Sequence, residues 1–108
     1  MSVAKVVRLR VDPQASRALD AVLEDAQSAF AAEVGLVHWG IYAGAADNER
    51  ILVEVFADEN AVREHDDSHH VQTLIAAFES LEVEVVANEQ LTPPTASSTE
   101  RATKENSK

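Results

Sequence analysis

Three of the four histidines of this chain stand in one short segment, where two aspartates accompany them. They are His65, His69 and His70, and the segment follows an apolar stretch, 51–56, that carries Glu54 in its middle. An imidazole has an ordinary pKa of about 6.5, so it can accept or donate a proton near neutral pH. A carboxyl group within an apolar stretch needs a partner or a route to water. We therefore expect any chemistry of this protein between these two segments, as proton transfer.

Two of the histidines are candidate catalytic residues. His65 is expected at the end of a helix near the mouth of a pocket, where it could take a proton from a phenol or an enol. His70, in the first turn of the next helix, could hold a second polar group of the same ligand. The alternatives are a helix-end histidine that interacts with the helix dipole or Asp66, and a surface histidine near that aspartate. His69 is expected in solvent.

Four further residues are candidates for substrate binding. Trp39, Phe56 and Phe78 could form walls around an aromatic ligand by offset stacking, or they could simply belong to the core. Glu54 could be a general base with a raised pKa, or a buried acid bonded to an arginine or a backbone amide.

A metal site is the other use of such a cluster. His65 and His69 would share one face of an unbroken helix, and paired imidazoles suit zinc or nickel. Ser68 predicts a break between them and no third ligand is obvious, so we expect no metal and no cofactor.

The elements that must position these residues follow from the hydrophobic pattern. Alternating apolar residues predict strands over 3–11, 36–43, 51–56 and 82–91. Asp12, followed by proline, starts a helix that is expected to end near Glu33. Asp58 caps a short helix to about His65, and Ser68 caps a longer one through Leu81.

The order of elements, βαββ(αα)β, predicts an α+β fold of the ferredoxin-like kind, with a four-stranded antiparallel sheet and helices on one face. The alternation puts Val37 beside Trp39 on one face of its strand, and Val83, Val85 and Ala87 together on another. The strand 51–56 is apolar on both faces. One layer of helices cannot cover both faces of a sheet, so we predict a homodimer.

Length and composition narrow the remaining possibilities. We expect one domain over 1–91 and a flexible polar tail over 92–108, which is rich in small polar and charged residues. The net charge of −10 disfavours nucleic acid and anionic membranes as partners. No cysteine and no leader-like segment is present, so a cytoplasmic location is expected.

Three local patterns resemble the antibiotic biosynthesis monooxygenase domains of the dimeric α+β barrel superfamily. The first is Glu33-Val34-Gly35-Leu36-Val37-His38-Trp39, and the second is Val53-Glu54-Val55-Phe56. The third runs from Asp58-Glu59-Asn60-Ala61-Val62 through His65 to Ser68-His69-His70. In order and spacing they cover residues 3 to 91.

The resemblance implies a dimer with sheets packed face to face and a pocket between each sheet and its helices. Relatives include cofactor-free monooxygenases of quinols or phenols, haem-degrading enzymes and an isomerase of a phosphorylated signalling sugar. The first strand lacks the asparagine of the haem-degrading relatives, His65 stands where they have a tryptophan, and Ile75 where they have a histidine. The asparagine, tryptophan and tyrosine set of the polyketide monooxygenases is not clearly reproduced either.

The leading expectation is therefore a cofactor-independent monooxygenase acting on a small aromatic, quinol-like or phenolic substrate. An isomerase of a phosphorylated keto-sugar and a non-catalytic dimer that binds a small molecule remain the alternatives.

Overall fold

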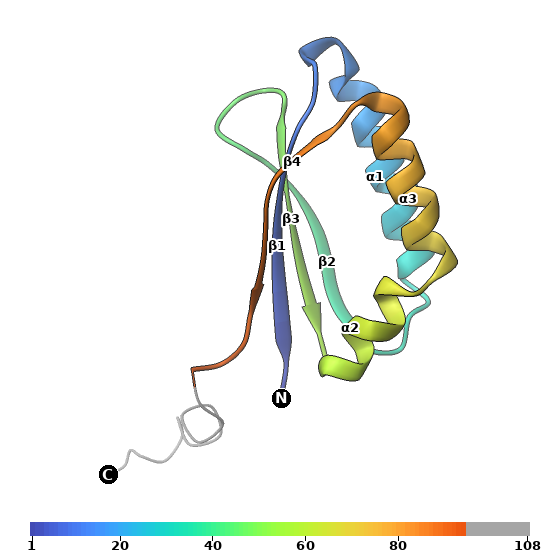
Figure 1. Cartoon of the computed structure of the whole chain (residues 1–108), viewed down its shortest axis with the longest axis vertical. Helices are drawn as coiled ribbons and strands as arrows, with labels where there is room; N and C mark the ends of the chain where they lie inside the picture. Colours follow the sequence, from blue (N-terminus) through green and yellow to red (C-terminus); the bar gives the residue numbers. More distant parts are fainter. Residues whose placement is uncertain (95–108) are drawn as a thin grey trace.

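The computed structural model describes residues 1–94, so most of the tail predicted over 92–108 lies outside the described residues. The strands are β1 (Val3–Arg10), β2 (Leu36–Ala43), β3 (Glu49–Phe56) and β4 (Glu84–Leu91). The helices are α1 (Ser16–Phe30), α2 (Glu59–Asp66) and α3 (His69–Leu81), and a 3₁₀ turn spans Pro13–Ala15. All strand pairs are antiparallel, in the order β2-β3-β1-β4, and the helices lie on one side of the sheet (Figure 1). The predicted ferredoxin-like α+β fold is confirmed.

Side-chain caps start α2 and α3 where the sequence predicts. Asp58 Oδ1 accepts a hydrogen bond of 2.8 Å from the amide of Ala61, and Ser68 Oγ accepts one of 3.2 Å from the amide of Val71. Each cap satisfies an amide that the first helical turn leaves without a partner. The break predicted at Ser68 is therefore real, and α2 and α3 are separate helices. In contrast, α1 ends at Phe30 and not near Glu33, because the chain turns over 31–35 before it enters β2.

The core lies between the sheet and the helices. Its fully buried side chains come from all the layers, and they include Leu9, Leu19, Leu23, Phe30 and Leu52. A smaller cluster under α2 joins Phe56 to Val3, Ala61 and Val62. The helical stripe and the inward face of the strands thus bury each other, as their periodicities require.

Two of the predicted strand faces are wrong, because extra residues interrupt the alternation. In β2 the pairing with β3 shifts between Leu36 and His38, which leaves Val37 67% exposed and not beside Trp39. In β4 the shift puts Val85 opposite Leu9 and Ala87 opposite Arg8. Ala87 and Val85 therefore face opposite sides of the sheet. A β-bulge adds one residue to a strand, so the residues after it exchange their inward and outward positions. No local sequence pattern predicts either of these two bulges.

The second face of the sheet has no helix over it within residues 1–94 (Figure 1). Its apolar centre is formed by Val6, Ile51, Val53 and Val55, which neighbouring strands leave half-buried. Tyr42 lies on the same face and is 48% exposed, with its hydroxyl 3.1 Å from the ring of His38. We call this surface the back face.

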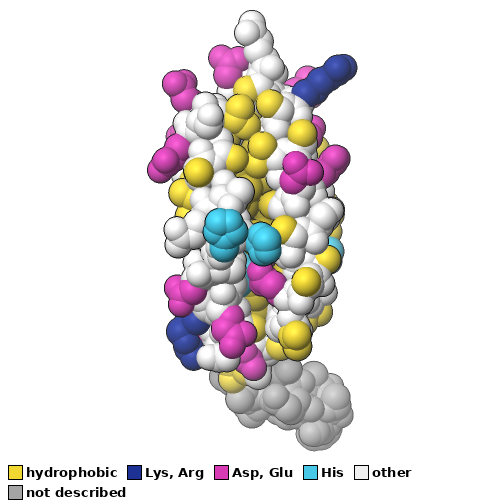
Figure 2. Space-filling view, turned by 90° about the vertical axis from the view of Figure 1, so that its right-hand side faces the viewer, with side chains coloured by type: hydrophobic (Ala, Val, Ile, Leu, Met, Phe, Trp, Pro, Cys, Tyr) yellow, Lys and Arg dark blue, Asp and Glu magenta, His cyan; other side chains and the backbone are white. Residues whose placement is uncertain are grey.

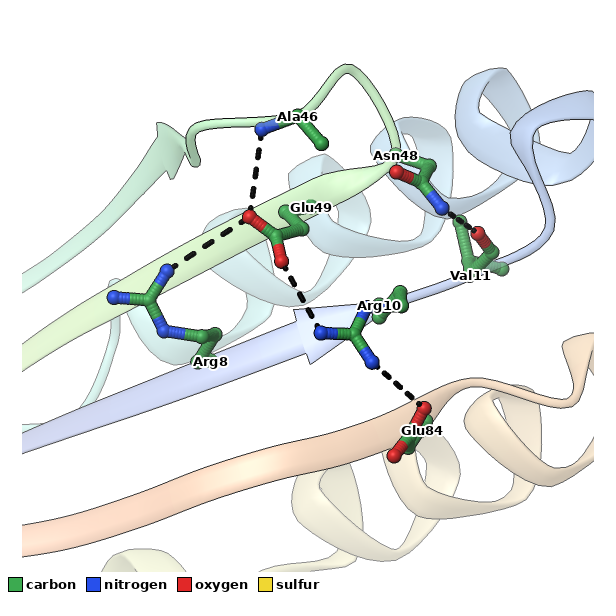
Figure 3. A network of polar contacts seen from close by, with 7 residues as sticks. All are labelled: Arg8, Arg10, Val11, Ala46, Asn48, Glu49 and Glu84. Carbon is green, nitrogen blue, oxygen red and sulfur yellow. Dashed lines mark hydrogen bonds and ion pairs between the residues drawn. The ribbon is translucent and has the colours of Figure 1, made fainter.

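Charged side chains occupy one end of the back face, where β3 begins (Figure 3). Glu49 lies 3.9 Å from Arg8 and 3.4 Å from Arg10, which also contacts Glu84 at 3.3 Å. The amide of Ala46 and these two arginines hold the pKa of Glu49 below its usual range. Both arginines of β1 thus form ion pairs with acidic side chains on the side of the sheet away from the helices.

No helix among the described residues has the length and apolar character needed to cross a membrane. The cytoplasmic location stays a prediction.

Candidate functional site

A cavity of about 430 Å³ lies between the sheet and the helices α2 and α3. Its apolar lining comes from Val7, Trp39, Leu52, Val71, Leu74, Ile75, Phe78 and Val85, and its polar lining from Lys5, Glu54, His65, Asp66 and Asn88. Ile75 and Val85 are about half exposed, which locates its mouth between α3 and β4. The volume falls within the range of small-molecule pockets. We call this space the inner cavity.

A larger hollow of about 680 Å³ lies at the other end of the helical side, near the β2–β3 hairpin. Its one arginine, Arg50, is already bound to Asp20 at 2.7 Å, and no histidine lines it. The smaller inner cavity is the better candidate, because a histidine and a buried carboxyl group both line it.

His65 lies inside the molecule and not at a pocket mouth, with a side chain that is 5% exposed. Its Nδ1 is 2.8 Å from Glu33 Oε1, and its Nε2 is 3.8 Å from Glu54 Oε1. The ring lies between Phe30 and Phe56, with centroids 4.4 Å and 5.1 Å away. The imidazole is therefore packed against two aromatic rings and held by a hydrogen bond at Nδ1, whereas Nε2 has no partner in hydrogen-bond range among the described residues.

The approach of α2 to the α1–β2 turn brings His65 to Glu33. A side-chain carbon on Gly35 would lie 2.4 Å from the Cβ of Ala61, so only glycine allows this contact. Glycine at this position therefore permits the short distance between the two elements.

Glu54 lies on the wall of the inner cavity, and its side chain is 7% exposed. Burial raises its pKa, while the charges of Lys5 and His65 oppose the increase. No arginine pairs with it among the described residues, and Lys5 is bound to Asp66 at 3.4 Å. Trp39 lies opposite Glu54 on β2, and its indole slightly lowers the pKa of Glu54. The buried N–H of this indole has no acceptor in hydrogen-bond geometry among the described residues.

The other predicted residues lie in three different environments. Trp39 and Phe78 line the inner cavity with His65 and Glu54, whereas Phe56 is fully buried behind the His65 ring and does not line it. His70 is exposed on the helical face and lies 6.4 Å from Phe30, measured between ring centroids. The fold does not bring His65 and His70 to one cavity.

His70 borders a separate hollow of about 320 Å³, whose lining includes Glu33, Gly35, Ala61, Glu64, Ser68 and His70. We call it the outer hollow. Histidine side chains are visible at the surface of this side of the molecule, at the lower end of the apolar groove between α1 and α3 (Figure 2). His70 thus belongs to the outer side of the helical layer.

Sequence reasoning missed Lys5 and Glu33 as parts of the site, and it named Asp66 only as a neighbour of the histidines. A signal existed for Lys5, because it lies on the same face of β1 as Val3, Val7 and the other inward apolar residues. Glu33 begins one of the three family patterns, but no pattern predicted its contact with His65, since the two residues are distant along the chain. Its contact depends on how α2 packs.

The metal arrangement considered for this segment needs one continuous helix. The break between α2 and α3 separates His65, which points inward, from His69, which is exposed. Within residues 1–94, no group of three or more histidine and acidic side chains is arranged to hold a metal ion.

Comparisons with known proteins agree with this architecture. Among solved structures, the chain is similar to Rv0793 from Mycobacterium tuberculosis, at 28% identity and a TM-score of 0.77, covering 88% of this chain and 97% of that one. It is also similar to a variant of SnoaB, a cofactor-independent oxygenase from Streptomyces nogalater, at 20% identity and a TM-score of 0.71, covering 88% and 95%. At the latter identity the likeness concerns the fold alone. No curated protein matches the chain.

The family model described as "Antibiotic biosynthesis monooxygenase" matches residues 2–77, which include β1, the turn with Glu33, Glu54 and His65. The match covers most of the chain and all but the last strand of the sheet. The protein belongs to the antibiotic biosynthesis monooxygenase family.

Proposed function

We propose that this protein is a cofactor-independent monooxygenase that oxidises a small phenolic or quinol-like compound. The observation that carries the proposal is one buried imidazole on the wall of a largely apolar cavity, with Nε2 on the cavity side. Membership of the family supports oxygen chemistry in general. The choice of substrate rests on the character of the inner cavity.

The first step is the removal of a proton by His65. Nε2 accepts the proton of a phenol hydroxyl, so the O–H bond breaks and an N–H bond forms. The phenolate that remains is electron-rich and gives one electron to O₂, and recombination of the two radicals forms a carbon–oxygen bond. The peroxide anion takes the proton back from His65, which regenerates the base, and the hydroperoxide then loses water, with the second hydrogen coming from the reacting carbon. A phenol with hydrogen on the reacting carbon becomes a quinone, with one oxygen atom in the product and the other in water.

The walls of the inner cavity suit this chemistry. Trp39 and Phe78 offer flat apolar surface for an aromatic ring, and the remaining apolar side chains limit the entry of water. Glu54 lies near Nε2, where its negative charge stabilises the imidazolium after proton transfer.

The charges around the inner cavity favour an uncharged ring over a sugar phosphate. A phosphate calls for arginine or lysine side chains. No arginine lines the cavity in the described part of the chain, and its one lysine, Lys5, is bound to Asp66. This distribution disfavours the isomerase alternative.

The functional molecule in this proposal is a homodimer. The back face is apolar at its centre and uncovered in one copy, and the same surface of a second copy would cover it by two-fold symmetry. The inner cavity, on the opposite side of the sheet, stays accessible in such a dimer.

Oxygen consumption by the purified protein with a panel of quinols and phenols tests the function. We expect His65→Gln to lower kcat by about 100-fold or more, because it removes the general base. His69→Gln is the matched control, since His69 is exposed on α3, and it should retain full activity.

Turnover without oxygen would contradict the monooxygenase and favour the isomerase. Ligand binding in the absence of any turnover would favour the non-catalytic binding protein. Unchanged oxygen uptake by His65→Gln would remove the assignment of the base.

A further inference from the structure

We infer that Glu33 is a positioning residue that holds His65 in the tautomer with Nε2 free to accept a proton from the inner cavity. This inference rests on the proposed function of His65 as the base. It gives a role to a carboxyl group that does not line the inner cavity and for which the sequence analysis predicts no contact with His65.

The first observation is the two-sided placement of the imidazole. Glu33 is 2.8 Å from Nδ1 and lines the outer hollow, whereas Glu54 is 3.8 Å from Nε2 and lines the inner cavity. Nδ1 therefore faces outward and Nε2 faces the cavity. Only the outward contact is short enough for a hydrogen bond.

This geometry decides the tautomer. A carboxylate can only accept a hydrogen bond, so a neutral imidazole at 2.8 Å from Glu33 carries its proton on Nδ1. Nε2 then has a free lone pair on the cavity side. The opposite tautomer would place the Nδ1 lone pair against the carboxylate oxygen and would leave no base in the cavity.

The second observation concerns the charge of Glu33. Its other oxygen, Oε2, is buried and has no hydrogen-bond partner among the described residues. No second donor contacts this carboxyl group among the described residues, so His65 is its one hydrogen-bond partner there. The imidazolium formed after proton transfer is stabilised by this contact, as in other pairs of a carboxylate and a catalytic histidine.

The groups around His65 are compatible with this role. Glu54 of β3 faces the His65 ring. Beyond Glu54, Lys5 of β1 is bound to Asp66, which lies on the same helix as His65. The side chains packed on its two faces, Phe30 of α1 and Phe56 of β3, carry no charge. His70 of α3 lies 6.4 Å from the same Phe30 ring, measured between ring centroids. Glu33 is thus the only acidic side chain in hydrogen-bond contact with the ring in the described structure.

The decisive measurement is nitrogen-15 NMR of the imidazoles in the resting protein, with His65→Gln used to assign the His65 signals. We expect wild type to show the Nδ1–H tautomer. Glu33→Gln should keep it, because the amide oxygen can still accept, and Glu33→Ala should give a mixture. Glu64→Gln is the matched control, because Glu64 lies on the same outer hollow but contacts Asn60, and it should leave the signals unchanged.

Kinetics supply the second readout. Glu33 does not reach the cavity, so its replacement should lower kcat with little change in KM. We expect a loss of about 10-fold for Glu33→Gln, which loses the charge alone, and about 100-fold for Glu33→Ala. Glu33→Gln also guards against misfolding, because it preserves the shape of the side chain.

An Nε2–H tautomer in wild type would overturn the inference. So would a Glu33→Ala variant that melts earlier but keeps the wild-type tautomer and kcat, because Glu33 would then be merely structural. The NMR experiment needs no substrate and decides the role of Glu33 even if no compound is oxidised. Failure of wild type to consume oxygen with any compound would instead count against the proposed function.

Discussion

Glu54 is an acid that the fold holds inside the molecule without an arginine beside it. Burial is the main cause of its raised pKa, and the positive charge of Lys5 is the main influence in the opposite direction. Buried carboxyl groups with shifted pKa values are common where proteins carry out proton chemistry. The same shift makes this residue a source of pH-dependent stability.

The first prediction concerns Glu54→Gln. The folded-state pKa of Glu54 lies above its ordinary value of 4.5, so the fold favours the protonated carboxyl. The stability from this preference is fully present below pH 4.5 and is lost as the pH rises through the folded-state pKa. Glutamine is neutral throughout, so the variant should match wild type at about pH 4 and melt at a higher temperature at about pH 8.

Thermal unfolding at both pH values measures this difference. Glu79→Gln, at an exposed position of α3, is the control and should show no such dependence on pH. A Glu54→Gln variant less stable than wild type at the higher pH would mean that the carboxylate is stabilised in the fold and that its pKa is not raised.

At the scale of elements, the position of α2 depends on two contacts of different kinds. The side chain of Asp58 caps its start, and the bare backbone of Gly35 lets Ala61 approach. The hydrogen bond between His65 and Glu33 lies beside the second contact. A displacement of α2 should therefore disturb the site as well as the fold.

The second prediction is that Gly35→Ala destabilises the protein by about 1–3 kcal/mol, the usual cost of overpacking. The added methyl group meets the Cβ of Ala61, so Ala61→Gly in the same chain should recover part of the loss. A double-mutant cycle of unfolding free energies measures this coupling. Additive effects of the two changes would contradict the close contact.

The sequence was sufficient for features that depend on neighbouring residues. Asp58 and Ser68 predicted the starts of α2 and α3. It was insufficient where packing between distant segments decides. The bulge at Val37 and the pairing of His65 with Glu33 both depend on contacts across the fold, as does the separation of His70 from the cavity.

At the scale of the whole molecule, the sheet has one face covered by helices and one uncovered. The centre of the back face is apolar, and its charged end holds Glu49 in contact with Arg8 and Arg10. These internal ion pairs would allow a second copy to pack there without leaving unpaired charges.

The third prediction is that Val53→Glu weakens dimer formation. Val53 lies between Val6 and Gly40 on the back face, and a carboxylate there would be buried in the dimer. Dimer affinity should fall by about 30-fold or more, which corresponds to about 2 kcal/mol. Sedimentation at micromolar concentration measures the change.

Val34→Glu is the control, since Val34 is fully exposed in the α1–β2 turn and away from the sheet, so it should leave the dimer intact. A wild-type protein that sediments as a monomer would contradict the proposed assembly.

Trp39 is the only tryptophan of the chain, and it lies in the wall of the inner cavity with its ring 5.1 Å from Phe30. The intrinsic fluorescence of the protein therefore comes from a single indole at the place where a ligand would bind. Quenching or a spectral shift on titration with unlabelled compounds would report occupancy directly. The unmodified protein can thus serve as its own sensor in a search for its substrate.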